Sequence, residues 1–73
     1  MENYQLIIKA YDRSGALERI LRVIRHRGGY IQSMNMHAEQ NKELLVKFDL
    51  INSRAKSQIT TQLLKLADII AID

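Results

Sequence analysis

The run from Glu43 to Ile51 is the feature that most constrains how this chain can fold. Apolar residues occupy every second position of it, at Leu44, Val46, Phe48 and Leu50. The intervening positions are mixed and carry Leu45, Lys47, Asp49 and Ile51. Because successive side chains of a β-strand point to opposite faces, this alternation predicts a strand with one face in a core.

Three further segments carry strand signals. Asn3 to Tyr11 alternates in the same way, with its predicted core face made of Tyr4, Leu6, Ile8 and Ala10. Tyr30 to Glu39 is predicted as another strand, joined to the run above by a tight turn at Gln40-Asn41-Lys42. Ile69 to Ile72 is short and apolar, which is consistent with a final strand.

Two helices are predicted between these strands from apolar residues at helical spacing. The first has its stripe at Ala16, Leu17, Ile20, Leu21, Val23 and Ile24. Asp12 or Ser14 can cap its start, and Gly28-Gly29 is expected to end it. The second has its stripe at Ala55, Ile59, Leu63 and Leu66, and the polar segment Asn52-Ser53-Arg54 can cap it.

The resulting order, β-α-β-β-α-β, predicts a single α+β domain over residues 1–73. Its arrangement would be the ferredoxin-like sandwich, a four-stranded antiparallel sheet with both helices on one face. The other face would then expose Ile7, Leu45 and Ile51, which suggests a protein contact. Tyr30 to Glu39 would be an edge strand, whose unpaired backbone groups can pair with a second copy.

Size and composition favour a chain that works with partners. With 73 residues and no cysteine, the domain has a small core and no disulfide to reinforce it, so a partner subunit is expected. Apolar residues form 47% of the chain and charged residues 26%, as in ordinary globular proteins. No secretory leader or membrane-spanning run is recognised, so we expect a cytoplasmic protein without membrane contact.

The positive charge is unevenly distributed, because four arginines and His26 fall between Arg19 and Arg27. Arg19, Arg22 and His26 would share a helix face, and such a stripe could contact phosphates in nucleic acid. An RNA-binding domain of this fold also needs aromatic residues on its third strand, and Lys42 to Phe48 does not supply that pattern. We therefore expect no nucleic-acid partner, and a solvated face or a protein contact as the role of the stripe.

The loop before the first helix can recognise a small ligand. Gly15 leaves backbone N–H groups unshielded at the positive end of the helix, where a carboxylate is favoured. Asp12 could receive an ammonium group, so the loop suits a free amino acid better than a phosphate. The alternative is that Gly15 only permits a tight turn and Asp12 only caps the helix.

The sequence gives little indication of metal binding or catalysis. His26 and His37 lie outside any ligand cluster, and no nucleophile, base and orienting group stand at recognisable spacing. Acylphosphatase, an enzyme of similar fold, holds phosphate with an arginine in a glycine-rich loop. The loop before the first helix here is shorter and carries Asp12, so it does not match that site. Met34 and Met36 flank Asn35 on the predicted edge strand, where flexible thioethers suit either packing or an adaptable interface.

The segments Asp12-Arg13-Ser14-Gly15-Ala16-Leu17 and Ile31-Gln32-Ser33-Met34 resemble the opening of ACT domains, which are small amino-acid-binding regulatory modules. Within that family, Leu17 to Gly28 and Ser33 to Met36 resemble the short small subunits of acetolactate synthase, of the isozyme II type. The resemblance implies a homodimer formed through edge strands and a non-catalytic regulatory role toward a large catalytic subunit. Thiamine diphosphate, FAD and magnesium would belong to the large subunit, which serves branched-chain amino-acid synthesis.

The resemblance also implies site residues. Effector binding would involve Asp12, Arg13, Ser14, Gly15, Ala16, Tyr30 and Ile31. Subunit contacts would involve Arg19, Arg22, His26, Ser33, Met34, Asn35 and Met36. Asp12 and Tyr30 replace the two Asn residues of valine-sensitive relatives, so binding of valine should be weak or absent. The alternative function is a stand-alone amino-acid sensor that regulates another enzyme.

Overall fold

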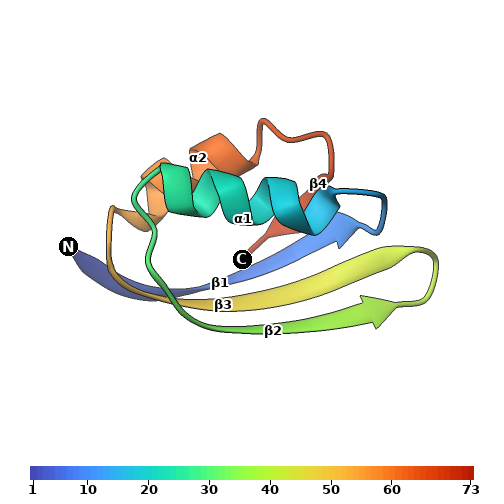
Figure 1. The fold of residues 1–73 in the computed structure, drawn as a ribbon, viewed down its shortest axis with the longest axis horizontal. Helices are drawn as coiled ribbons and strands as arrows, with labels where there is room; N and C mark the ends of the chain where they lie inside the picture. The colour runs from blue at the N-terminus through green and yellow to red at the C-terminus, as the bar shows by residue number, and fades with distance from the viewer.

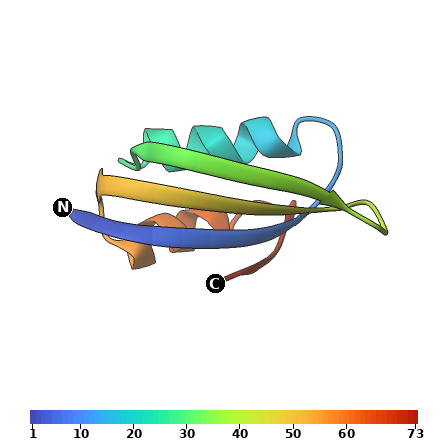
Figure 2. The ribbon, with the colours of Figure 1, turned by 90° about the horizontal axis from the view of Figure 1, so that it is seen from below.

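The computed structural model describes residues 1–73 and contains four strands and two helices. In chain order these are β1 (Glu2–Tyr11), α1 (Ala16–His26), β2 (Ile31–Glu39), β3 (Glu43–Ser53), α2 (Lys56–Leu63) and β4 (Ile69–Ile72). The strands form one antiparallel sheet in the order β2-β3-β1-β4. Both helices cover one face of it, and Figure 2 looks at the face that carries none. The predicted ferredoxin-like arrangement is confirmed.

The core lies between the sheet and the helices. Its buried side chains include the four expected from β3, with Phe48 the largest, and three of the four expected from β1. The fourth, Tyr4, is only partly buried and packs against this core. From the helices it receives Ile20, Ile24, Ile59 and Leu63. Burial of one such side chain stabilises the fold by about 1.5–3 kcal/mol, so this cluster is the main stabilising element of a chain without disulfides.

Neither helix begins with the cap that the sequence suggests. The N-cap of α1 is Gly15, and no side chain caps it, so the prediction of Asp12 or Ser14 is wrong. Gly15 has φ +76°, and this left-handed turn redirects the chain without any side-chain acceptor.

The prediction for α2 fails for another reason. Its N-cap is Ala55, again without a side-chain bond, because β3 continues through Ser53. Ser53 is buried there, and its hydroxyl accepts a hydrogen bond from Tyr30 N at 2.8 Å and donates one to Ile51 O at 2.9 Å. The helix also ends at Leu63, so Leu66 packs against the core from the following turn.

The glycines after α1 end the helix as predicted. Arg27 is the C-cap, and Gly28 follows with φ +89°. Gly28 N donates to Arg25 O at 3.3 Å and Gly29 N to Ile24 O at 2.8 Å, the two bonds of a Schellman motif. This motif turns the chain directly into β2.

Two surfaces of the sheet have no cover within the chain. The face opposite the helices carries the half-buried Ile7, Leu45 and Ile51, as predicted, because they alternate with the buried residues of β1 and β3. β2 is an edge strand, also as predicted, and its side away from β3 has no strand partner. Met34 and Met36 are opposite Phe48 and Val46, so they lie on the helix side of β2, yet each is 43% exposed.

Neither helix has the length and apolar character that crossing a bilayer requires. The cytoplasmic location stays a prediction.

Candidate functional site

The loop between β1 and α1 is held by backbone hydrogen bonds to two distant segments. Tyr11 N donates to Asp68 O at 2.8 Å, and Asp12 N donates to Lys42 O at 2.8 Å. Ala16 N closes the loop by donating to Arg13 O at 3.0 Å. The loop is therefore fixed between the β2–β3 hairpin and the segment that precedes β4.

Arg19 covers the start of α1. Its Nη2 donates to Ser14 O at 2.9 Å, and its Nη1 lies only 2.7 Å from where a Cβ on Gly15 would be. Gly15 is therefore needed for two reasons, its positive φ and the room that the guanidinium occupies. The N–H groups of Leu17 and Glu18 have no hydrogen-bond partner in the chain, as is usual in a first helical turn.

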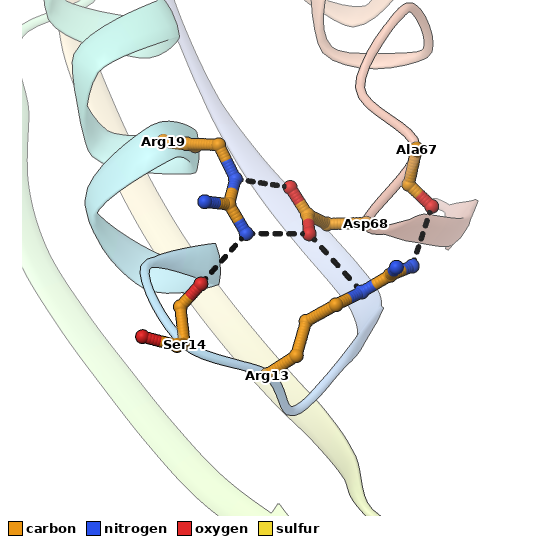
Figure 3. A network of polar contacts seen from close by, with 5 residues as sticks. All are labelled: Arg13, Ser14, Arg19, Ala67 and Asp68. Carbon is orange, nitrogen blue, oxygen red and sulfur yellow. Dashed lines mark hydrogen bonds and ion pairs between the residues drawn. The ribbon is translucent and has the colours of Figure 1, made fainter.

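Asp68 joins the loop to the far end of the chain (Figure 3). Arg19 binds its carboxylate with two bonds, Nε to Oδ2 at 2.8 Å and Nη2 to Oδ1 at 2.9 Å. Arg13 Nε lies 3.3 Å from Oδ1, and Arg13 Nη2 donates to Ala67 O at 3.0 Å. The Asp68 side chain is only 6% exposed, so two arginines share one nearly buried carboxylate.

The network changes the protonation of its members. The bidentate bond from Arg19 is the main cause that lowers the pKa of Asp68, and the charges of Arg19 and Arg13 add to it against the opposing effect of burial. The same bond raises the pKa of Arg19. Both groups are therefore charged at neutral pH, and the pair anchors the loop.

The role of Asp68 was not predicted from the sequence. The available signal was an isolated acid in an apolar stretch, between Ala67 and Ile69. Such a residue is seldom buried without a cationic partner, so it could have prompted a search for one. Nothing in the sequence identified Arg19 and Arg13, which are 49 and 55 positions away.

Tyr30 and Ile31 lie at the other end of α1. Tyr30 is 64% exposed and follows the glycine turn, while the Asp12–Ala16 loop precedes the helix. A helix of 11 residues is about 16 Å long, so one chain does not bring these two groups of predicted effector residues together. Figure 1 shows the loop before α1 and the turn after it at opposite ends of that helix.

A groove lies beside the Tyr30 turn, along the uncovered side of β2. It has a volume of about 430 Å³ and is lined by Leu21, Arg25, Gly29, Tyr30, Ile31 and Met34. Four of the six are apolar, so the groove continues the exposed methionine surface of the edge strand. It suits an apolar side chain better than a free ion.

The predicted subunit-contact residues occupy two places. Ser33, Met34, Asn35 and Met36 lie together on exposed β2, where Ser33 Oγ donates to Asp49 Oδ2 at 2.6 Å. Arg22 and His26 are exposed on α1 and form no ion pair. Arg19 was grouped with them but is bound to Asp68 inside the chain. A contact role for any of these residues stays a prediction.

A family model and similar proteins of known name point to the same family. The family model described as "ACT domain" matches residues 12–72. The small subunit of acetolactate synthase isozyme 2 from Escherichia coli K12 is 34% identical over 70 residues, covering 94% of this chain and 80% of that protein. The protein of the same name from Shigella flexneri matches equally well.

Solved structures agree on the fold. The acetolactate synthase small subunit from Thermotoga maritima superposes with a TM-score of 0.87 at 13% identity, covering 100% of this chain and 47% of that one. This chain therefore spans about half the length of the Thermotoga protein. The ACT domain from the GTP pyrophosphokinase of Chlorobium tepidum has a TM-score of 0.76 at 15% identity, covering 97% and 94%.

Proposed function

This chain belongs to the ACT domain family and, within it, to the small subunits of acetolactate synthase, and from this premise we propose that it binds and activates a large catalytic subunit. Its role is regulatory. The large subunit would carry the thiamine diphosphate, FAD and magnesium, and would serve the synthesis of branched-chain amino acids. The observation that carries the proposal is the 34% identity to an acetolactate synthase small subunit over 94% of the chain.

The uncovered edge of β2 supports a homodimer. Two copies that pair their β2 strands antiparallel about a two-fold axis would form one continuous sheet. The exposed Met34 and Met36, on the helix side of that edge, would then become covered. Burial of these apolar side chains would supply the additional stabilisation that a 73-residue domain lacks on its own.

The same symmetry would complete the effector site. Because the loop and the Tyr30 turn lie at opposite ends of α1, an antiparallel dimer would bring the loop of one copy toward the Tyr30 turn of the other. Asp12 and Tyr30 would stand where valine-sensitive relatives use amides. The ring of Tyr30 and the guanidinium of Arg19 would restrict the space for a ligand. Valine would therefore bind weakly or not at all.

Co-expression with the large subunit tests the proposal. We expect a stable complex and a higher rate of acetolactate formation than the large subunit gives alone. Titration of the isolated dimer with valine, leucine and isoleucine should give little heat. If no complex forms and one of these amino acids binds with micromolar affinity, the chain is instead a stand-alone amino-acid sensor.

A further inference from the structure

A polar cleft separates the C-terminal end of α1 from α2. It has a volume of about 420 Å³ and is lined by His26, Arg27, Arg54, Gln58 and Gln62. A second hollow of about 370 Å³ shares His26 and Arg27 and adds Arg22 and Val23. Together the lining residues of the two hollows form what we call the basic cleft, which has only one apolar side chain.

None of the three arginines of the basic cleft forms an ion pair within the chain. The ion pairs of the chain join Lys9 to Glu43, Arg13 and Arg19 to Asp68, and His37 to Glu39. None includes Arg22, Arg27 or Arg54, so no carboxylate lies within 4.0 Å of these guanidiniums. An anion that enters the cleft would not have to displace an internal partner.

Arg54 is held in place at the wall of the cleft. Its N–H donates to Gly28 O at 3.1 Å, and its carbonyl accepts a hydrogen bond from the hydroxyl of Tyr4 at 2.5 Å. Its side chain crosses Gly28, where an added Cβ would lie 2.9 Å from both Cγ and Cδ of Arg54. Gly28 thus serves the Schellman turn and also leaves room for the Arg54 stem. These contacts fix the backbone of Arg54 and the start of its stem, while its exposed guanidinium makes no hydrogen bond within the chain.

The other groups at the cleft favour a peptide over a phosphate. The cleft lies at the C-terminal end of α1, where the helix dipole disfavours any anion, so its arginines must supply the attraction and a single carboxylate is disfavoured less than a multiply charged phosphate. Gln58 and Gln62 lie one turn apart on α2, and their amides offer acceptors as well as donors. A peptide backbone can use both, because it has N–H and C=O groups, whereas a phosphate accepts hydrogen bonds only.

We propose that the basic cleft binds an acidic segment of the large catalytic subunit. Carboxylates of that segment would pair with Arg27 and Arg54, and its backbone would bond to the two glutamines. This inference rests on the proposed function. It goes further by assigning the contact to the end of the domain remote from the Arg19–Asp68 pair.

The experiment measures binding of the whole chain to the large subunit. In the test variant, Arg27→Gln with Arg54→Gln, two charges are removed from the cleft while long polar side chains are kept. In the matched control, Lys42→Asn with Lys65→Gln, two charges are removed from exposed positions elsewhere. We expect about tenfold weaker binding for the test variant, with a smaller salt dependence, and nearly unchanged binding for the control.

The outcomes separate the two proposals. If the wild-type chain does not bind the large subunit, the proposed function fails and this inference with it. Equal binding by wild type and test variant, or equal loss in test and control, would overturn the cleft assignment alone. Inorganic pyrophosphate that binds wild type but not the test variant, while the complex keeps its affinity, would assign the cleft to phosphate instead.

A cross-link identifies the contacting segment directly. A photo-reactive residue in place of Gln58, in the assembled complex, should link to a stretch of the large subunit rich in Asp and Glu. A link to a stretch without acids would contradict the proposal.

Discussion

Two arginines lie beside each end of α1, but only the two at the N-terminal end are paired with a carboxylate. At the N-terminal end, Arg13 and Arg19 share the carboxylate of Asp68 (Figure 3). At the C-terminal end, Arg27 and Arg54 have no carboxylate partner. The first pair fixes a loop within the chain, and the second remains available to another molecule. What separates a structural arginine from a contact arginine here is the chain segment that the fold brings beside it.

The largest effect is expected at β2, the proposed dimer edge. Met34→Asp should convert the proposed homodimer into monomers, because a charge would be buried at the proposed β2 contact without a partner. Light scattering should give half the mass of the wild type. Leu64→Asp is the matched control, since Leu64 is also an exposed apolar residue but lies at the end of α2. An unchanged mass for Met34→Asp would exclude pairing through β2.

Removal of the Asp68 carboxylate would leave the arginines at both ends of α1 without a carboxylate partner. Asp68→Ala leaves Arg13 and Arg19 without their partner and removes the side-chain anchor of the loop, so thermal unfolding should occur about 5–10 °C lower. Circular dichroism measures the shift. Asp49→Ala removes an exposed acid that accepts hydrogen bonds from Gln5 and Ser33, and should have a clearly smaller effect. Equal shifts would show that the Asp68 network does not specially stabilise the fold.

Charge reversal at the free end should spare the fold. Arg22→Glu changes an exposed, unpaired side chain, so the unfolding temperature should stay within about 1–2 °C of wild type. Half-maximal activation of the large subunit should need about tenfold more of the variant. Activation at the wild-type concentration would mean that Arg22 is only a solvated residue.

The smallest effect is a pH dependence. The pKa of Asp68 lies below its ordinary value of 3.8 in the folded chain, so the folded state binds this proton less readily than the unfolded state. Its stabilisation is therefore complete above the unfolded pKa and lost as the pH falls through the lower, folded pKa. The difference in unfolding temperature between wild type and Asp68→Asn should be constant from about pH 5 to about pH 8 and shrink below about pH 4. A difference that grows in acid would contradict the assignment.

The strands and the order of elements were predictable because they depend on local signals. The alternation of Leu44 to Leu50 and the glycines after His26 determine backbone structure within a few residues, and both predictions are confirmed. The helix starts were not predictable in this way. Ser14 is available as a cap, but the left-handed turn at Gly15 begins α1 without it.

The candidate site was only partly predictable. The loop and the edge strand were selected, from their residues and from the resemblance to ACT domains, but helical spacing grouped Arg19 with Arg22 and His26. The helical spacing of these three residues is the same whether Arg19 binds within the chain or contacts another subunit. The difference depends on Asp68, 49 residues later, whose position follows from the sheet order that places β4 beside β1. Such a contact has no local signature.

The separation of the Asp12 loop from the Tyr30 turn has a consequence for regulation. A ligand that needs both would find a complete pocket only in assembled pairs, so its apparent affinity would fall as the protein is diluted. By thermodynamic reciprocity, the ligand would raise the affinity of one copy for the other by the same factor by which pairing raises the affinity for the ligand. A chain of this design would respond to its own cellular abundance as well as to a metabolite.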